Sequence, residues 1–523
     1  MANRNFNPNQ FVNEIYENLY PNIFRLPFVT MPEIGMTLDE IKIMPGYSDI
    51  LPHEVDLSTT IGNMQLNFPL ITAPMSTVTD GLLAIHAGQC GAVGTIFREP
   101  SPQIQLDWIE QALNAENCLV GTPKLVRLGD KVATAERILS RHSRSVIPVL
   151  TNKGLLSGLV FTDNIAFNEK HAQEPIKKWM VKFQDLKVAY VGTPFAEIKE
   201  RLIKEPYCNV LPLVDKNRKF YGLYFMKDVL AENQTTFNDR PLVGMSIGAS
   251  PEDINQRLIP ALEMGVGSVV VDTSHGNCKE VLSQTASVLE TVAHFAKKRD
   301  ITKPTVISGN VADVDGYVKM CMLEVGGAKV DAVKFGIGCG SICTTSNLTG
   351  IGVPLFTNLR EAAYTKLQLK KSGKYAAAII ADGGIPGTGQ AVVALGAGAD
   401  GVMAGKWVVA FSESISGQKR REGEDYVDYE GMASPEALKK RLDDRYIQKG
   451  HRKTVPEGIA GKVLHRGPTR KCMRKDKEAM QIAISHTGAK TISALQTYCN
   501  ANPRRFYTFS GVGTATQLST HVN

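Results

Sequence analysis

The feature that most constrains the fold is a repeating texture over residues 66–110 and 241–415. In both stretches a short β-branched or apolar run is followed by a glycine-rich turn and then by a helix-like segment. The runs are PLITAPM, GAVGTIF, GSVVVDT, KPTVISGN, DAVKFGIG, AAAIIADGG and DGVMAG. Near-continuous apolar strands bounded in this way are typical of a parallel sheet covered by helices. These seven runs, with one or two more that the pattern does not place, predict an α/β fold, a (β/α)8 barrel, rather than an open doubly wound sheet.

The ends of the predicted strands carry most of the polar side chains with chemical potential. Asp272, Asn310, Cys343 and Asp382 each lie at or beyond the end of an apolar run. Because a barrel of this type places its chemistry on the loops at the C-terminal ends of the strands, we expect these four residues on one face.

The stretch 118–236 has a different texture and contains an internal repeat. SVIPVLTNKGLLSGLVFTDN aligns with NVLPLVDKNRKFYGLYFMKD, so that Pro148 matches Pro212 and Gly158 matches Gly222. Each copy predicts a helix followed by two strands joined by a polar turn. Two such copies can bury their apolar faces against each other, which favours a compact inserted module.

The insertion divides the chain into three expected parts. Residues 1–117 form the first part of the barrel, 118–236 form the inserted module and 237–523 complete the barrel. The charged, glycine-punctuated segment 412–470 has weak apolar periodicity and is interpreted as a mobile flap. The polar stretch that begins SALQTYCNANPRRF is expected to be a surface tail.

The composition and charge of the chain limit the classes of partner that it is expected to bind. The net charge of +7 is small for 523 residues and is not gathered into one basic tract. This favours phosphorylated small molecules over nucleic acid. No apolar run approaches the ~20 residues that span a bilayer, so we expect a soluble, cytoplasmic protein with no membrane partner. Nine cysteines without a CxxC pair favour neither a disulfide framework nor a zinc ribbon.

The most informative segment is DAVKFGIGCGSICTTSNLTGIGVP, residues 331–354. Its closely spaced glycines allow turns that side chains forbid and let backbone amides and carbonyls approach a bound group. Ser341 offers a hydroxyl and an amide to phosphate oxygens. Cys343 can act as a nucleophile towards an electron-poor ring carbon. The alternative for Cys343 is a buried small apolar residue, but its place in the loop favours the nucleophile.

From about Pro32 to Thr491 the chain resembles the superfamily of inosine 5′-monophosphate (IMP) dehydrogenases and guanosine 5′-monophosphate (GMP) reductases. GIGCGSICTT resembles the catalytic loop of that family, and ADGGI at 381–385 resembles its ribose-binding turn. The inserted repeat resembles a tandem CBS pair, which implies purine nucleotides bound between its copies. Asp228 stands where such modules often place a ribose-binding carboxylate.

The resemblance implies roles for many residues. IMP would be bound by Asn310, Lys334, Ser341, Asp382, Gly384, Gly405, Lys406, Tyr429, Gly431 and Met432. NAD would be bound by Asp272, Thr273, Ser274 and Gly336. A monovalent cation, most often K⁺, would be held by the carbonyls of Gly338, Gly340 and Cys343. The family also implies a homotetramer.

The implied reaction has two halves. Cys343 adds to the purine carbon between the two ring nitrogens, hydride passes to NAD, and water then hydrolyses the covalent thioimidate. RYIQ resembles a pair on the family's flap in which Arg445 activates water with help from Tyr446. Glu457 with Thr345 resembles an alternative proton route.

Two other functions remain open. A GMP reductase, with NADPH as reductant, would share the cysteine loop and the ribose aspartate. RYIQ favours the dehydrogenase, because the reductase needs no activated water. A catalytically silent nucleotide sensor is the third possibility, because the chain departs from the family pattern in places. Among these departures, Lys406 replaces a usual serine, and Cys339 replaces a usual proline or small residue.

Overall fold

The computed structural model describes residues 35–115, 119–120, 125–142, 146–162, 165, 171–204, 209–226, 229, 235–238, 240–421, 423–435, 437 and 455–508. The chain divides into two compact units. One combines Met1–Asn114 with Asn233–Asn523, and the other is Ala115–Glu232.

The larger unit is built on a closed parallel barrel of eight strands. In barrel order the strands are β16 (Val243–Ile247), β17 (Ser268–Asp272), β18 (Thr305–Val311), β21 (Ala332–Phe335), β22 (Ala378–Asp382), β23 (Gly401–Ala404), β4 (Leu70–Thr72) and β5 (Val93–Ile96). The predicted barrel is therefore confirmed. Its eighth strand is β16, with the sequence VGMSI, which is not one of the seven apolar runs.

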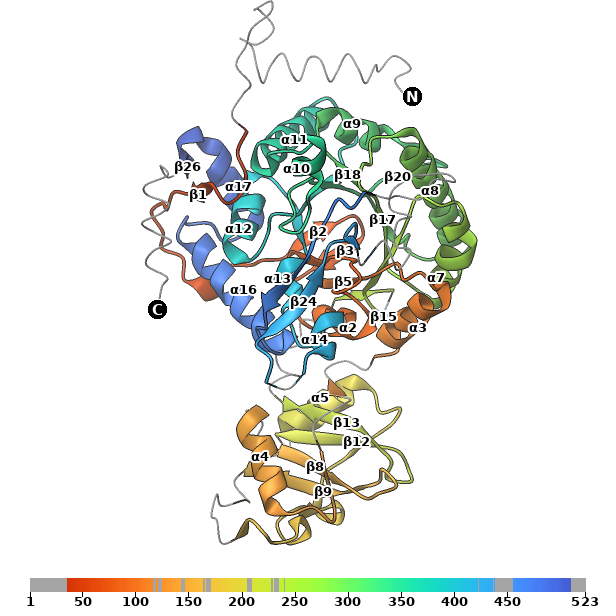
Figure 1. Cartoon of the computed structure of the whole chain (residues 1–523), viewed down its shortest axis with the longest axis vertical. Coiled ribbons are helices and arrows are strands. Elements are labelled where there is room, and N and C mark those ends of the chain that lie inside the picture. The colour runs from red at the N-terminus through yellow and green to blue at the C-terminus, as the bar shows by residue number, and fades with distance from the viewer. Residues whose placement is uncertain are drawn as a thin grey trace, which may run out of the picture. The chain divides into compact units, whose positions relative to one another are not determined.

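Helices surround the strands, as Figure 1 shows. They include α2 (Gly81–Gln89), α3 (Pro102–Leu113), α7 (Ile259–Met264), α8 (Lys279–Arg299), α9 (Val314–Met322), α11 (Leu355–Lys371) and α12 (Thr388–Ala397). Side chains alternate along each strand between the helices and the barrel interior. In β17, for example, Val269 and Val271 belong to the large core cluster that includes the helices, whereas Val270 belongs to the interior cluster.

Parts of the predicted flap have regular structure. The strands β24 (Tyr426–Glu430) and β25 (Ala460–Leu464) pair in antiparallel register, and α14 (Ile415–Lys419) precedes them. In β24 the side chains of Val427 and Tyr429 are buried while Tyr426 and Asp428 are exposed. This alternation of buried and exposed side chains is the pattern from which β24 could have been predicted, but it spans only one short strand.

The expected surface tail is wrong for residues up to 508. Helix α17 (Ile492–Ala501) buries Ile492, Leu495 and Cys499, and β26 (Phe506–Thr508) pairs with β1 (Ile41–Ile43). The three buried positions recur at helical spacing, and they pack on the barrel core although the segment between them is polar.

The smaller unit contains the two repeats as two four-stranded sheets. The first comprises β7 (Val126–Arg127), β8 (Val146–Leu150), β9 (Leu156–Phe161) and β10 (Val181–Lys182), with α4 (Val132–His142). The second comprises β6 (Leu119–Val120), β11 (Ala189–Tyr190), β12 (Val210–Val214) and β13 (Phe220–Phe225), with α5 (Phe195–Lys204).

The two repeats meet across reciprocal contacts. The amide of Leu156 donates to Arg218 O, and the amide of Phe220 donates to Gly154 O. Because these pairs exchange equivalent positions of the repeat, they indicate a local pseudo-two-fold relation. A shared apolar cluster, which includes Leu159 and Leu223, lies between the copies.

Within the described residues, no helix is both long enough and apolar enough to cross a membrane.

Candidate active site

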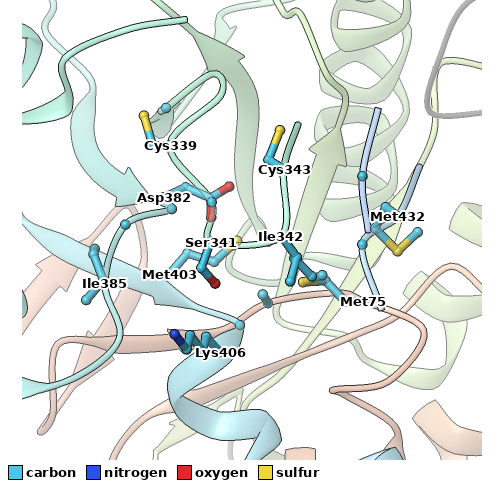
Figure 2. Close-up of a pocket in the computed structure, with 18 of the residues that line it drawn as sticks. Met75, Cys339, Ser341, Ile342, Cys343, Asp382, Ile385, Met403, Lys406 and Met432 are labelled. Carbon is cyan, nitrogen blue, oxygen red and sulfur yellow. The ribbon is translucent and has the colours of Figure 1, made fainter. Parts of the chain in front are cut away.

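A cavity of about 290 Å³ lies at the carboxyl ends of the barrel strands. Its wall includes these predicted site residues: Asp272, Asn310, Gly336, Gly338, Gly340, Ser341, Cys343, Asp382, Gly384, Gly405, Lys406, Tyr429, Gly431, Met432 and Glu457. Figure 2 shows Ser341 and Cys343 on one loop at the pocket, with Asp382 and Lys406 on two other segments. The strand-end rule therefore places the expected residues around one cavity.

The loop after β21 approaches the neighbouring strand very closely. Gly336 has a φ of +136°, and a Cβ on it would lie 1.9 Å from the carbonyl oxygen of Asp382. Any other residue would clash with backbone there, so this glycine lets the loop begin against the end of β22.

The loop is then tied to the segment that leads into β25. The amide of Thr344 donates to Glu457 O at 3.0 Å, and the amide of Ile459 donates to Ile342 O at 3.0 Å. Cys343 and Gly458 form an isolated antiparallel bridge between these contacts. The backbone around Cys343 is thus held by a segment more than a hundred residues away.

A hydrogen-bonded chain runs from the cysteine to a carboxylate. The thiol of Cys343 donates to Thr345 Oγ1 at 3.2 Å, and the Thr345 hydroxyl donates to Glu457 Oε2 at 3.0 Å. Thr345 does not line the cavity, whereas the residues at both ends of the chain do. The arrangement can carry a proton between the sulfur and the carboxylate.

The floor of the cavity is ionic and buried. Lys334 is 0% exposed, and its Nζ lies 2.6 Å from Asp272 Oδ1 and 3.0 Å from Asp382 Oδ2. Lys334 was expected to contact the substrate. The structure places Lys334 outside the cavity lining, where it contacts Asp272 and Asp382, two of the residues that line the cavity.

Asn310 has an unused acceptor in the same floor. Its Nδ2 donates to Gly336 O at 2.7 Å and to Asp382 Oδ2 at 2.9 Å. Its Oδ1 is buried and has no hydrogen-bond partner among the described residues. Because an unpaired buried acceptor is costly, and because Asn310 lines the cavity, this oxygen indicates a ligand with a hydroxyl or amide donor at this point.

The rim carries groups suited to an anion. Ser341, Gly405 and Lys406 line it, and among described residues Lys406 has no hydrogen-bond or ion-pair partner. A Cβ on Gly405 would lie 2.6 Å from Tyr429 Oη, so glycine is needed where that strand end meets the tyrosine. An unpaired cation beside hydroxyl and amide donors can bind phosphate.

Some predicted residues lie elsewhere. Thr273 is buried and its hydroxyl donates to Gly309 O at 2.7 Å, and neither it nor Ser274 lines the cavity. Arg445, Tyr446 and Asp228 lie outside the described residues.

Sequence reasoning missed the apolar part of the wall. Met75, Ile342, Ile385 and Met403 line the cavity together with Asp39. Met75 follows β4 in TAPM, so the strand-end rule used for the polar residues would have found it. Polarizable methionine side chains beside a cysteine suit a flat aromatic ligand.

The second cysteine of the loop has a different environment. The Cys339 thiol donates to Val353 O at 3.3 Å. Burial, with smaller contributions from the charges of Asp382 and Cys343, raises its pKa to about 12. Cys339 therefore stays protonated near neutral pH.

Comparisons with known proteins agree with this geometry. The family described as "IMP dehydrogenase / GMP reductase domain" matches residues 35–517. The inosine-5′-monophosphate dehydrogenase of Aquifex aeolicus is 34% identical over 470 residues, which cover 88% of this chain and 91% of that protein. The enzyme of the same name from Streptococcus pyogenes serotype M1 is 33% identical over 491 residues, covering 92% and 94%.

Solved structures show the same fold. A GMP reductase from Trypanosoma brucei in complex with guanosine 5′-monophosphate has a TM-score of 0.63 at 24% identity, covering 94% of this chain and 99% of that chain. A second structure of that enzyme has a TM-score of 0.65 at 22% identity, covering 95% and 100%.

Proposed function

The chain belongs to the IMP dehydrogenase/GMP reductase family, and from that premise we propose that it oxidises IMP to xanthosine monophosphate with NAD. The observation that carries the proposal is the position of Cys343, which lines the same cavity as Asn310 and Lys406. Among the described residues, neither Asn310 Oδ1 nor the Lys406 ammonium has a partner. The cavity therefore combines a thiol nucleophile, a hydroxyl-binding floor and an anion-binding rim, which together suit covalent chemistry on the base of a nucleoside monophosphate.

The ribose and phosphate of IMP fit the two polar parts of the cavity. Asp382 Oδ2 accepts from Asn310 and Lys334, and no described residue bonds its other oxygen, Oδ1. That oxygen and Asn310 Oδ1 can accept the two ribose hydroxyls. The phosphate would lie against Ser341, Gly384, Gly405 and Lys406, and the base near Tyr429, Gly431 and Met432.

Cys343 starts the reaction. Its sulfur bonds to the purine carbon between the ring nitrogens, and the thiol proton moves through Thr345 towards Glu457. The hydrogen on that carbon leaves with both bonding electrons, so the nucleotide is oxidised and remains joined to Cys343 as a thioimidate. NAD, when bound, supplies the hydride acceptor. Asp272 and Gly336, which line the cavity, would contact its nicotinamide riboside, and Thr273 and Ser274 follow Asp272.

Hydrolysis completes the cycle. Water adds to the thioimidate carbon, the sulfur leaves, and Thr345 returns a proton to it. We assign activation of the water to Arg445 with Tyr446, and a second route to Glu457 through Thr345.

Arg445→Ala should slow hydrolysis more than hydride transfer, which predicts a burst of NADH followed by a slow steady state. Equal loss in both phases would remove Arg445 from this role.

The direct assay distinguishes three functions. Purified protein mixed with IMP, NAD and K⁺ should produce NADH, measured by absorbance. No NADH, but consumption of NADPH with GMP, would identify a reductase. Inactivity in both assays, with nucleotide binding retained, would identify a sensor.

The cation proposal rests on backbone oxygens. Gly338 and Gly340 bring carbonyls to the loop without side-chain charge, and the Gly340 carbonyl accepts only the Cys343 amide, at 3.0 Å, among the described backbone bonds. A carbonyl has a second lone pair, so these groups fit a large, weakly hydrated ion such as K⁺. The cation would order the loop that holds Cys343. Replacing K⁺ by Li⁺ should lower turnover, and unchanged turnover would contradict the proposal.

The smaller unit is proposed to be a CBS pair that binds purine nucleotides. The reciprocal contacts between its repeats support this proposal. Calorimetric titration of the whole chain with ATP and GTP tests it. The homotetramer stays a prediction that light scattering can check.

A further inference from the structure

Four consecutive strands of the barrel each contribute one residue to the ionic floor of the cavity. In barrel order β17 provides Asp272, β18 provides Asn310, β21 provides Lys334 and β22 provides Asp382. Lys334 stands between the two carboxylates. On β21 the neighbouring residues Val333 and Phe335 belong to the cluster that includes the helices, so Lys334 projects into the barrel.

A buried lysine in this position needs partners, and it has two. Its side chain is 0% exposed, and Nζ contacts Asp272 Oδ1 at 2.6 Å and Asp382 Oδ2 at 3.0 Å. Gly309 on β18 makes room for it, because a Cβ there would lie 2.8 Å from Lys334 Cβ. One ammonium group therefore sets the orientation of two carboxylates that line the cavity.

The two carboxylates belong to different subsites in the proposed reaction. Asp382 faces the ribose of IMP, and Asp272 faces the ribose of the dinucleotide. On the basis of that proposed function, we propose that Lys334 is a positioning residue that aligns both substrates through one nitrogen, without touching either. By engaging Asp382 Oδ2 together with Asn310, it directs Oδ1 to the purine ribose.

The first test is Lys334→Met, which keeps the length of the side chain and removes the charge. The KM values for IMP and for NAD should both rise by about tenfold or more, with a smaller change in kcat, a loss of the size found when groups that orient metal ligands are removed. Discrimination between IMP and its 2′-deoxy analogue should shrink. Unchanged KM values for both substrates would overturn the proposal.

Lys334→Met leaves two acids facing each other and can destabilise the fold. A second comparison avoids that imbalance. Asp272→Asn alone should raise the KM for NAD and leave the KM for IMP within about threefold of the wild type. Adding Lys334→Met to Asp272→Asn should raise the KM for IMP about tenfold. If the double variant keeps the IMP KM of Asp272→Asn, Lys334 does not position Asp382.

Lys366→Met is the matched control. Lys366 contacts Asp400 Oδ2 at 2.5 Å in another partly buried pair, and neither residue lines the cavity. The Lys366→Met substitution should lower the unfolding temperature without changing the KM for IMP or for NAD. Equal KM changes in this variant would indicate general loosening and overturn the proposal.

Absence of NADH formation by the wild type would instead defeat the proposed function, and the dissociation constants of IMP and NAD would then test Lys334 directly.

Discussion

The floor and the rim of the cavity are built in different ways. The floor consists of Asp272, Asn310, Lys334 and Asp382 at the ends of adjacent barrel strands, and its ion pairs are buried. Gly405 and Lys406 form the anion-binding part of the rim. The part around Cys343 consists of the loop 336–344 and the segment 455–459, which hold each other by a few backbone bonds. The floor is therefore suited to binding, which needs fixed groups. The Cys343 part of the rim is suited to chemistry that requires a sulfur to form and break a bond.

The sharpest test of this division is Cys343→Ala. The rim should lose its nucleophile while the floor still binds. We expect turnover to fall by more than about 10⁴-fold, as it does when a covalent nucleophile is removed. The dissociation constant of IMP, measured by calorimetry, should change by less than about threefold. Retained turnover would contradict covalent catalysis, and loss of IMP binding would contradict the division.

The second test removes the proton route in the rim. Thr345→Val breaks the chain between Cys343 and Glu457 and should lower kcat by about 10²-fold, within the range for general acid–base groups. The KM for IMP should change little. Thr344→Val is a control on the same loop. Equal kcat losses in both variants, measured by steady-state kinetics, would indicate a loop effect instead of a proton route.

The third test is made in the floor. Asp382→Asn removes a charged acceptor facing the ribose and should lower kcat/KM for IMP by about 10–100-fold, mainly through KM. Asp400→Asn, in the ion pair outside the cavity, serves as the control and should leave kcat/KM unchanged. A loss confined to kcat in Asp382→Asn would place this residue in the chemistry and not in binding.

The smallest effect is expected at the other cysteine of the loop. Because burial raises the pKa of Cys339 to about 12, iodoacetamide at pH 8 should react with Cys343 first. Cys339→Ala should keep turnover within about threefold and be inactivated by iodoacetamide at the wild-type rate. If the Cys339→Ala variant resists inactivation by iodoacetamide, Cys339 is the reactive thiol.

Much of the barrel and of the cavity wall could be predicted from the sequence. The apolar runs indicate the strands, and the polar residues at their ends indicate the cavity wall. β16 was not predicted, although its sequence VGMSI resembles in composition strands that were, such as TVISGNV of β18. The C-terminal α17 and β26 escaped because their few buried side chains pack on distant parts of the chain. The position of Lys334 depends on which face of β21 points inward and on what the neighbouring strands bring to it, and neither can be read from spacing alone.

The most direct measurement is the intact mass of the protein during turnover. The protein is mixed with IMP and NAD, stopped with acid within milliseconds to seconds, and digested to locate any modified residue. The account predicts a nucleotide adduct on Cys343 that is absent without NAD and absent in Cys343→Ala. NADH production with no adduct at any time, or an adduct on Cys339, would contradict it.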